Sequence, residues 1–369
     1  MTRRNLLALV LALGALLTVS APAGAYNERA DGYFSFLDPA GKVIFQTALQ
    51  VSAGDEFIAE DNSHYRVTRV DKDNAFCEYL GKASLAVEPA PSSSSWLASI
   101  LSAAARPASA VRGKTVALYH THSDESYVPS DGSASIYANG GIFKVGNAMA
   151  ATLRRLGLNV IHNTTPHDPH DAMAYTRSRR TAAQLLRRNP AALFDVHRDA
   201  VPREQYVAQV KGEDVTKVTL VVGRENPKIK ANLNFAKQLK EINDKANPGL
   251  IKGIFLARGT YNQDLFDRAL LIEAGTHENT RGAAERGIAL FADSVPRAIG
   301  VAGTPARRQP GPVNQRTGSW SALGWTLLLL ILGGAAYLYL STGSWSELKR
   351  KLGRFAGGEF SGLLGRKRK

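Results

Sequence analysis

Val116-Ala-Leu-Tyr-His-Thr-His-Ser-Asp-Glu125 is the stretch of sequence that best indicates the fold. It opens as a short apolar run, which is typical of a buried strand, and it closes on two histidines and an acidic residue. In α/β folds, functional side chains gather beyond the carboxyl ends of the strands. His122 and Glu125 are residue types that bind zinc through nitrogen and oxygen.

Two further apolar runs end in the same manner. Ala191-Ala-Leu-Phe-Asp-Val196 is followed by His197, and Arg268-Ala-Leu-Leu-Ile272 is followed by Glu273. If the three runs are neighbouring strands of one sheet, their ends meet at one edge and bring two histidines and a glutamate together. The pattern predicts a metal-dependent hydrolase.

The region around these motifs, residues 114–300, alternates between strand and helix signals. Such alternation predicts an α/β fold with a mostly parallel sheet flanked by helices on both faces. The expected strands are 115–119, 158–162, 191–196, 217–222, 251–256 and 269–273. The expected helices are 140–156, 174–188, 228–246, 262–268 and 280–297.

The preceding residues, 26–88, alternate apolar and polar side chains between turn signals, which predicts a small N-terminal antiparallel β domain. Its role is open between a folded spacer and a module that binds the cell wall or a partner. Residues 89–113 are rich in Pro, Ser and Ala and are typical of a linker. Residues 301–320 are interpreted as a stalk.

The two ends of the chain predict export and a membrane anchor. Residues 1–25 have a charged start, an apolar middle and small residues before Tyr26, as in a signal peptide; an uncleaved anchor helix is the alternative. Residues 321–341 form an uncharged apolar run long enough for one transmembrane helix. The tail, 342–369, holds eight basic and two acidic side chains, so it is expected in the cytoplasm, with the body on the extracytoplasmic side of the cell membrane.

The net charge limits the classes of binding partner, and the cysteine content limits the residue types that can bind a metal. The formal net charge is +14, which favours anionic partners such as lipid headgroups or wall polymers. Nucleic acid is excluded because the predicted topology places the basic body outside the cell. The single cysteine, Cys77, allows no internal disulfide and no cysteine-rich zinc site, so any metal is bound by His and carboxylate.

A zinc hydrolase needs three protein ligands, an open position for water and a carboxylate that moves protons. We assign His122, Glu125 and His197 as ligands and Glu273 as the catalytic base. The competing interpretation is that histidines at strand ends are structural hydrogen bonders. Four other residues are expected to bind substrate or support the ligands: His120, Arg198, His277 and Asn279. The histidines of the loop around 162–171 are expected to be mostly solvated.

Three motifs, His120-Thr-His-Ser-Asp-Glu125, Asp195-Val-His-Arg-Asp199 and Leu271-Ile-Glu-Ala-Gly-Thr-His-Glu-Asn279, together resemble the stage II sporulation protein P family. That family consists of cell-wall hydrolases related to zinc N-acetylmuramoyl-L-alanine amidases, and the resemblance covers roughly residues 114–298. It implies cleavage of the amide between N-acetylmuramic acid and L-alanine in peptidoglycan and leaves cleavage of peptide cross-links open. It also implies work in engulfment beside a lytic transglycosylase of the stage II sporulation protein D type.

The wider amidase pattern places its first zinc histidine on His122, its second on His197 and its catalytic glutamate on Glu273. Its zinc glutamate falls near Phe143 or Lys144, which cannot bind zinc, so Glu125 is the natural replacement. Two other functions remain compatible with the sequence. One is a peptidoglycan-binding scaffold with weak or no activity, and the other is a zinc endopeptidase or carboxypeptidase on the same fold.

Overall fold

The computed structural model describes residues 28–29, 31–86 and 114–300. The chain divides into two compact units, Met1–Thr304 and Pro305–Lys369, and the second lies wholly outside the described residues. The predicted signal peptide, linker, stalk, transmembrane helix and tail also lie outside them. In the part that is described, no helix is both long and apolar enough to cross a membrane.

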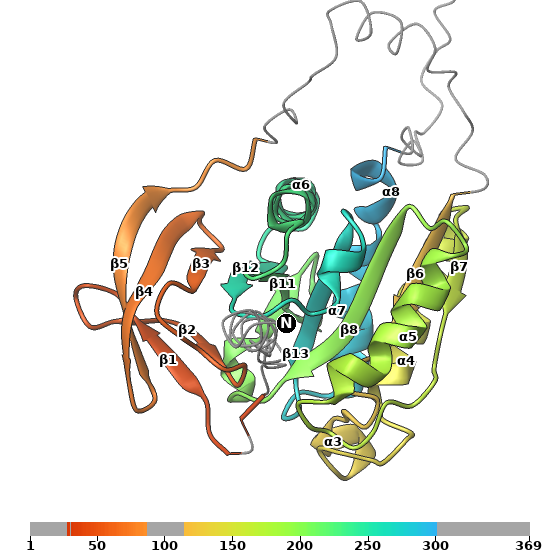
Figure 1. Ribbon diagram of the computed structural model, residues 1–369, viewed down its shortest axis with the longest axis horizontal. Coiled ribbons are helices and arrows are strands. Elements are labelled where there is room, and N and C mark those ends of the chain that lie inside the picture. Colours follow the sequence, from red (N-terminus) through yellow and green to blue (C-terminus); the bar gives the residue numbers. More distant parts are fainter. Residues whose placement is uncertain (1–27, 30, 87–113, 301–369) are drawn as a thin grey trace, which may run out of the picture. The chain divides into compact units, whose positions relative to one another are not determined.

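A single mixed sheet organises the described residues (Figure 1), with the strand order β2-β1-β5-β4-β3-β12-β11-β13-β8-β6-β7. The first five strands are β1 Phe34–Leu37, β2 Val43–Thr47, β3 Glu56–Ala59, β4 Ser63–Asp71 and β5 Asn74–Lys82. The other six are β6 Thr115–Tyr119, β7 Asn159–His162, β8 Ala192–Asp199, β11 Val218–Gly223, β12 Ile251–Ala257 and β13 Ala269–Thr276. A separate hairpin joins β9 Val207–Val210 to β10 Glu213–Thr216.

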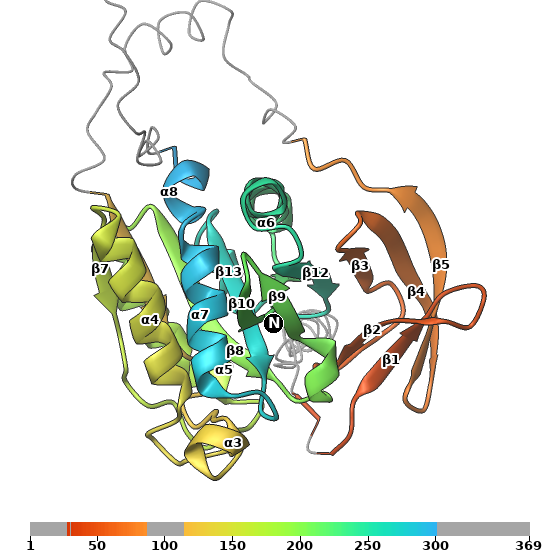
Figure 2. The same ribbon diagram turned by 180° about the vertical axis from the view of Figure 1, so that it is seen from behind.

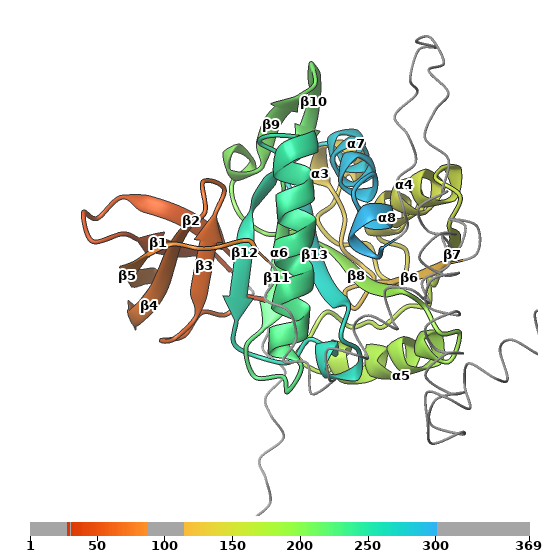
Figure 3. The ribbon, with the colours of Figure 1, turned by 90° about the horizontal axis from the view of Figure 1, so that it is seen from above.

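Helices cover both faces of the sheet, as Figures 1, 2 and 3 show together. Their bounds are α3 Val128–Asp131, α4 Ile142–Arg155, α5 Ala174–Leu186, α6 Ile229–Ala246, α7 Arg281–Ala292 and α8 Val295–Ala298, with short 3-10 turns η1 Arg203–Gln205 and η2 Gln263–Leu265. Because successive strand residues face opposite ways, Val116 and Leu118 of β6 share a core with α4 and α7, whereas Ala117 and Tyr119 pack with α5. The prediction of an α/β fold flanked by helices is confirmed.

The expectation of a mostly parallel sheet needs correction. Strands β6, β7, β8 and β13 are parallel to one another, and β11 is parallel to β12, but β11 runs antiparallel to β13, and β12 antiparallel to β3. Parallel strands need a crossover connection that usually holds a helix, whereas antiparallel strands accept a short link. The helix expected at 262–268 is only the three-residue turn η2, so β13 returns antiparallel to β12 and β11.

The strands expected within residues 26–88 all form, and they continue the central sheet. β3 pairs with β12 through Phe57↔Phe255 and Ile58↔Ile254. Sequence analysis placed these strands in a domain of their own, and the pairing instead makes them an extension of the sheet that carries the predicted site. An aromatic core lies on this extension, where the rings of Phe45 and Phe57 stack with centroids 4.1 Å apart and Phe36 meets Phe255 edge-on at 5.5 Å.

The hairpin β9–β10 was not expected from the sequence. Its turn residues, Lys211 and Gly212, both have positive φ values, 52° and 81°. Turns of this kind match the twist of a two-stranded hairpin, and glycine adopts the left-handed conformation without steric cost. The Lys-Gly pair between two short polar-apolar runs is the signal that could have identified it.

Candidate active site

The structure brings the four residues assigned to metal binding and catalysis to one edge of the sheet, on the face that α5 covers. His197 in β8 and Glu273 in β13 are register partners on adjacent strands. His122 and Glu125 follow the end of β6, the neighbour of β8 on its other side. All four are buried, with exposures of 1–3%. Sheet pairing therefore gathers residues that lie up to 151 positions apart in sequence.

Glu125 and His197 are in direct contact. The Nδ1 atom of His197 lies 3.3 Å from Oε1 of Glu125, and the backbone N–H of Arg198 donates to Oε2 of the same carboxylate at 3.0 Å. Two ligands of a tetrahedral zinc ion, with bonds of about 2.0–2.2 Å, lie about 3.3 Å from each other. The spacing of this pair therefore fits two ligands of one ion.

The imidazole of His122 is buried. Neither Nδ1 nor Nε2 has a partner among the described residues. The ring lies edge-on to His197, with centroids 5.2 Å apart. Burial, with the charges of His170 and His197, holds the pKa of His122 well below its usual range. The ring is thus neutral, with a free lone pair, and an unpaired buried nitrogen is costly unless a ligand satisfies it.

Asp195 orients the His197 ring from the side opposite Glu125. Its Oδ1 atom lies 2.9 Å from Nε2 of His197 and also accepts the backbone N–H of Thr121 at 2.8 Å. Burial alone would lower the pKa of His197, but the charges of Asp195 and Glu125 raise it well above its usual value. A carboxylate on one ring nitrogen leaves the other nitrogen directed to a ligand position, as in carboxylate–histidine–zinc arrangements.

Glu273 supplies a second unsatisfied group. Its Oε2 atom is buried and has no hydrogen-bond partner in the part of the chain that is described. Burial first, and then the charge of Asp199, raise the pKa of Glu273 well above its ordinary value. A nearby divalent cation would favour the ionised carboxylate, since an opposite charge lowers the pKa of an acid. Glu273 is therefore suited to act as a base only beside a cation.

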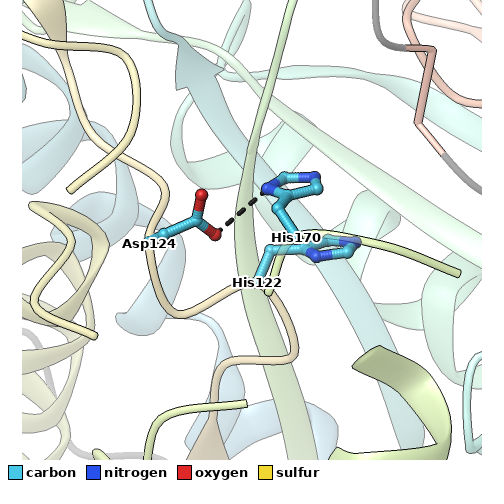
Figure 4. Close-up of side chains that lie close together, drawn as sticks. All are labelled: His122, Asp124 and His170. Atoms are coloured by element: carbon cyan, nitrogen blue, oxygen red, sulfur yellow. Dashed lines mark hydrogen bonds and ion pairs between the residues drawn. The ribbon is translucent and has the colours of Figure 1, made fainter. Parts of the chain in front are cut away.

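Two more residues, Asp124 and His170, join His122 in a compact group (Figure 4), whose ligand-type atoms all lie within 4.8 Å of one another. The rings of His122 and His170 stack face to face, with centroids 3.8 Å apart and planes 3° apart. His170 Nδ1 lies 3.1 Å from Oδ1 of Asp124, and its Nε2 lies 3.0 Å from Oε2 of Glu28. A second such group comprises Glu28, Glu125 and His170.

The charge on His170 argues for a flanking role. Burial alone would lower its pKa, but the bonds to Asp124 and Glu28 raise it to about 10. Both ring nitrogens of His170 are paired with carboxylates outside the assigned ligand set, so His170 is a less suitable ligand than His122, whose ring nitrogens have no partner among the described residues. The sequence-based expectation of a mostly solvated loop is wrong here: His170 lies in the site, and His167 is buried and donates from Nδ1 to the carbonyl of His120.

The His120 side chain makes hydrogen bonds and packing contacts with neighbouring elements of the fold. Its Nδ1 donates to the carbonyl oxygen of Val196 at 2.8 Å, and its Nε2 lies 2.8 Å from Nε2 of His162. Gly146 of α4 packs against this pair so closely that a Cβ atom there would lie 2.6 Å from both Nε2 atoms. His120 thus ties the end of β6 to β7, β8 and α4.

The remaining predicted residues surround the site. The Arg198 side chain donates to Glu28 and to the carbonyl of Ala134. Asn279 accepts the N–H of Thr276 at 2.9 Å and stabilises the turn after β13. His277 lines a cavity beside the site, and its Nδ1 has no partner among the described residues.

Sequence reasoning missed the contributions of Glu28, Asp124 and His170. Asp124 lies inside the motif that was singled out, so its position next to Glu125 was a usable signal. Glu28 and His170 are 142 positions apart in the chain and meet only in the folded protein, and neither spacing nor periodicity could have paired them.

The family model of stage II sporulation protein P matches residues 58–295. The chain belongs to this family. Stage II sporulation protein P of Bacillus subtilis (strain 168) is 30% identical over 199 residues, which are 49% of this chain and 50% of that protein. The chain thus spans about half the length of this curated relative. The match begins within β3, in keeping with the continuity of the N-terminal strands and the central sheet.

Some solved structures show a weaker likeness. Ami1, an N-acetylmuramyl-L-alanine amidase from Mycobacterium smegmatis, is 16% identical, with a TM-score of 0.35, over 52% of this chain and 97% of that chain. The CwlD amidase from Clostridioides difficile, solved in complex with the GerS lipoprotein, is 13% identical, with a TM-score of 0.33, over 51% of this chain and 99% of that chain. Scores this low define neither the fold nor the activity of the present chain.

Proposed function

We propose that this family member is a zinc-dependent N-acetylmuramoyl-L-alanine amidase that acts on peptidoglycan during sporulation. Membership in the stage II sporulation protein P family supports a role in the cell wall during sporulation. The observation that carries the chemistry is the group of unsatisfied buried atoms at the sheet edge, on His122 and Glu273, beside the Glu125–His197 pair. Unsatisfied buried polar atoms are rare in proteins, and their concentration at one strand edge is what a metal-binding catalytic site produces.

The donor set fits zinc. His122, Glu125 and His197 supply two imidazole nitrogens and one carboxylate, a combination found in zinc hydrolases, and Asp195 forms an ion pair with the other ring nitrogen of His197. Zinc bound there would lower the pKa of water to near 7 and polarise the carbonyl of the scissile amide. Asp124 and His170 flank this set and do not complete it.

The protein's own residues account for the remaining chemistry. Glu273, in β13 beside His197, takes a proton from the attacking water and passes it to the leaving amino group of L-alanine. Tyr175 of α5 lies edge-on to His122, with ring centroids 5.5 Å apart, and helps to exclude bulk water from the site. The burial that raises the pKa of Glu273 also strengthens its electrostatic response to a cation.

We further propose the location expected from the sequence: an exported chain, held by one C-terminal span, with the catalytic body outside the cell membrane. The positive net charge of +14 favours retention near anionic wall polymers and lipids. A transglycosylase that trims glycan strands is the proposed partner, because a shortened glycan gives a buried site easier access to the lactyl amide.

The test is mass spectrometry of purified peptidoglycan digested with the full chain, with zinc, with a chelator, and with Glu273→Gln. We expect free stem peptides with a new L-alanine amino terminus only in the zinc sample. Loss of the base is expected to lower the rate by about 10²–10⁴-fold. Products cleaved within the peptide would indicate an endopeptidase or carboxypeptidase, and intact muropeptides in every sample, including one pretreated with a lytic transglycosylase, would indicate a binding scaffold.

A further inference from the structure

A cavity of about 430 Å³ lies beside the candidate active site. It is lined by Arg198, the neighbour of His197, and by Asp124, the neighbour of Glu125. Its other charged or titratable residues are Glu28, Asp31, His170, His277 and Arg29, and the last of these forms an ion pair with Asp73. The cavity therefore touches residues adjacent to two of the three assigned zinc ligands. It is placed to receive a part of the substrate next to the scissile bond.

Arg198 is the main cation of this cavity, and its hydrogen-bonding capacity is only partly used. The residue is 5% exposed. One terminal nitrogen, Nη1, donates to Oε1 of Glu28 at 3.0 Å, and Nη2 donates to the carbonyl of Ala134 at 3.2 Å. The Nε atom is buried without a partner among the described residues. A guanidinium offers a planar fork of donors that matches both oxygens of a carboxylate. Here Glu28 contributes only one carboxylate oxygen, and a backbone carbonyl accepts from the other terminal nitrogen.

Glu28 reaches the cavity from a segment outside the named strands. The segment is tied down by a single bridge to Leu49 and by the N–H of Arg29, which donates to the carbonyl of Ala48. Its carboxylate is shared, with Oε1 on Arg198 and Oε2 on His170 at 3.0 Å. One carboxylate thus bridges two cationic side chains in a pocket next to the site, where a substrate carboxylate would find the same two partners.

We propose that this cavity is the subsite for a carboxylate of the peptide next to the scissile amide, that Arg198 binds that carboxylate, and that Glu28 occupies its position in the resting protein. This inference rests on the proposed function, since it takes the peptide side of the amide as the ligand. The residue after L-alanine in a muramyl peptide carries a free carboxylate when it is D-glutamate and lacks it when it is D-isoglutamine. Arg198 therefore distinguishes the two, and Glu28 competes with the acid.

The probes are N-acetylmuramoyl-L-alanyl-D-glutamate and N-acetylmuramoyl-L-alanyl-D-isoglutamine, each with its γ-carboxyl group blocked as an amide, so that the two differ only in the α-carboxylate. Their binding is measured by calorimetry on the full chain. Glu273→Gln is the background, so that neither probe is cleaved. We expect the acid to bind more tightly than the amide. Adding Glu28→Gln is expected to tighten the acid by about tenfold, the equivalent of one charge-assisted hydrogen bond, and to change the amide less than about twofold. Adding Arg198→Gln instead is expected to abolish the preference.

Asp31→Asn is the matched control, because Asp31 lines the same cavity and the described contacts of the Arg198 guanidinium do not include it. It should leave both affinities unchanged. If Glu28→Gln weakens the acid or leaves it unaltered, Glu28 supports Arg198 and does not compete, which overturns the proposal. Equal binding of acid and amide in the Glu273→Gln background alone also overturns it, even if the Glu28 variant does not fold. These measurements record binding without turnover. If the unmodified chain does not cleave peptidoglycan but the Glu273→Gln chain still prefers the acid to the amide, only the proposed function is refuted.

Discussion

The two halves of the sheet bury opposite kinds of side chain. At the edge formed by β6, β8 and β13, the protein buries polar side chains, and several of their atoms have no hydrogen-bond partner within residues 28–29, 31–86 and 114–300. In the extension formed by β1–β5, it buries aromatic rings against one another and against Phe255 of β12. An unsatisfied buried polar atom costs about 1–3 kcal/mol, whereas burial of a phenylalanine side chain stabilises the fold by about 1.5–3 kcal/mol.

The comparison indicates where stability and chemistry reside. The edge that carries the candidate site is a net cost in the absence of a ligand, and the aromatic extension helps to offset it because β3 and β12 pair directly. The N-terminal strands are therefore part of the support of the site.

The largest expected effect concerns the metal. His122→Ala should abolish stoichiometric zinc binding, because it removes a ligand, whereas His170→Ala should retain zinc, because His170 is held as a cation between Glu28 and Asp124. Loss of a supporting residue costs 10–100-fold in metal affinity, so loss of a ligand should cost more than about 100-fold. Zinc content and competition with a chromophoric chelator measure both variants.

The unfolding of the metal-free forms serves as the control for this pair of variants. Both should unfold at temperatures close to that of the metal-free parent, which separates loss of zinc from loss of fold. If His170→Ala loses zinc as completely as His122→Ala, the metal is bound by His122, Asp124 and His170. Glu125 and His197 are then not zinc ligands.

Part of this site was predictable from the sequence, for a physical reason. His122, His197 and Glu273 lie at or just beyond the ends of short apolar runs, and parallel strands β6, β8 and β13 bring such ends to one edge. Glu28 could not be predicted, because its place depends on a contact between the N-terminal segment and a residue 170 positions away. Burial and pairing of charges are properties of the folded chain, which local patterns do not encode.

The second prediction tests the continuity of the sheet. Phe57→Ala should lower the free energy of unfolding by about 3–5 kcal/mol, because Phe57 is 1% exposed, stacks on Phe45 and pairs with β12. Residues 31–86 and 114–300 should still unfold in one transition. Chemical denaturation followed by circular dichroism, and by hydrogen exchange of both regions, measures this.

Tyr79→Ala is the matched control, because Tyr79 belongs to the same extension but is 49% exposed. Its expected effect is within about 0.5 kcal/mol. Two separate transitions in Phe57→Ala, with the 114–300 region unaffected, would show that the extension is an independent domain and would remove its part in the comparison.

The direction of the strands was less predictable than their positions. The alternation of strand and helix signals predicted a mostly parallel sheet, but the connection between β12 and β13 contains only the three-residue turn η2 and no crossover helix. Tyr261 and Asn262, just before η2, both adopt a left-handed backbone, with φ of 49° and 55°, and Phe266, just after η2, is extended, so no longer helix forms there. Two consecutive residues in the left-handed conformation redirect the chain, and nothing in the hydrophobic period reveals them.

The smallest expected effect lies where the two halves meet, at Lys252 of β12. Its ammonium group lies 4.1 Å from the ring centroid of Tyr206 and 4.8 Å from that of Phe45. Burial lowers the pKa of Lys252 from 10.5 to about 7. Between those values the unfolded chain binds a proton that the folded chain has lost, so the free energy of unfolding should rise as the pH increases from about 7 to 10.5.

Lys252→Met should remove this part of the pH dependence and raise the free energy of unfolding at pH 7, by on the order of 2 kcal/mol. Denaturation of the parent and the variant at several pH values between 6 and 10 isolates the contribution, because the other lysines and tyrosines titrate in both proteins. Parallel stability curves would mean that Lys252 stays charged inside the aromatic extension, stabilised by the Tyr206 and Phe45 rings and by Asp199. In that case β12 would carry a buried charge and would belong with the polar edge of the sheet, and the aromatic half would begin at β3.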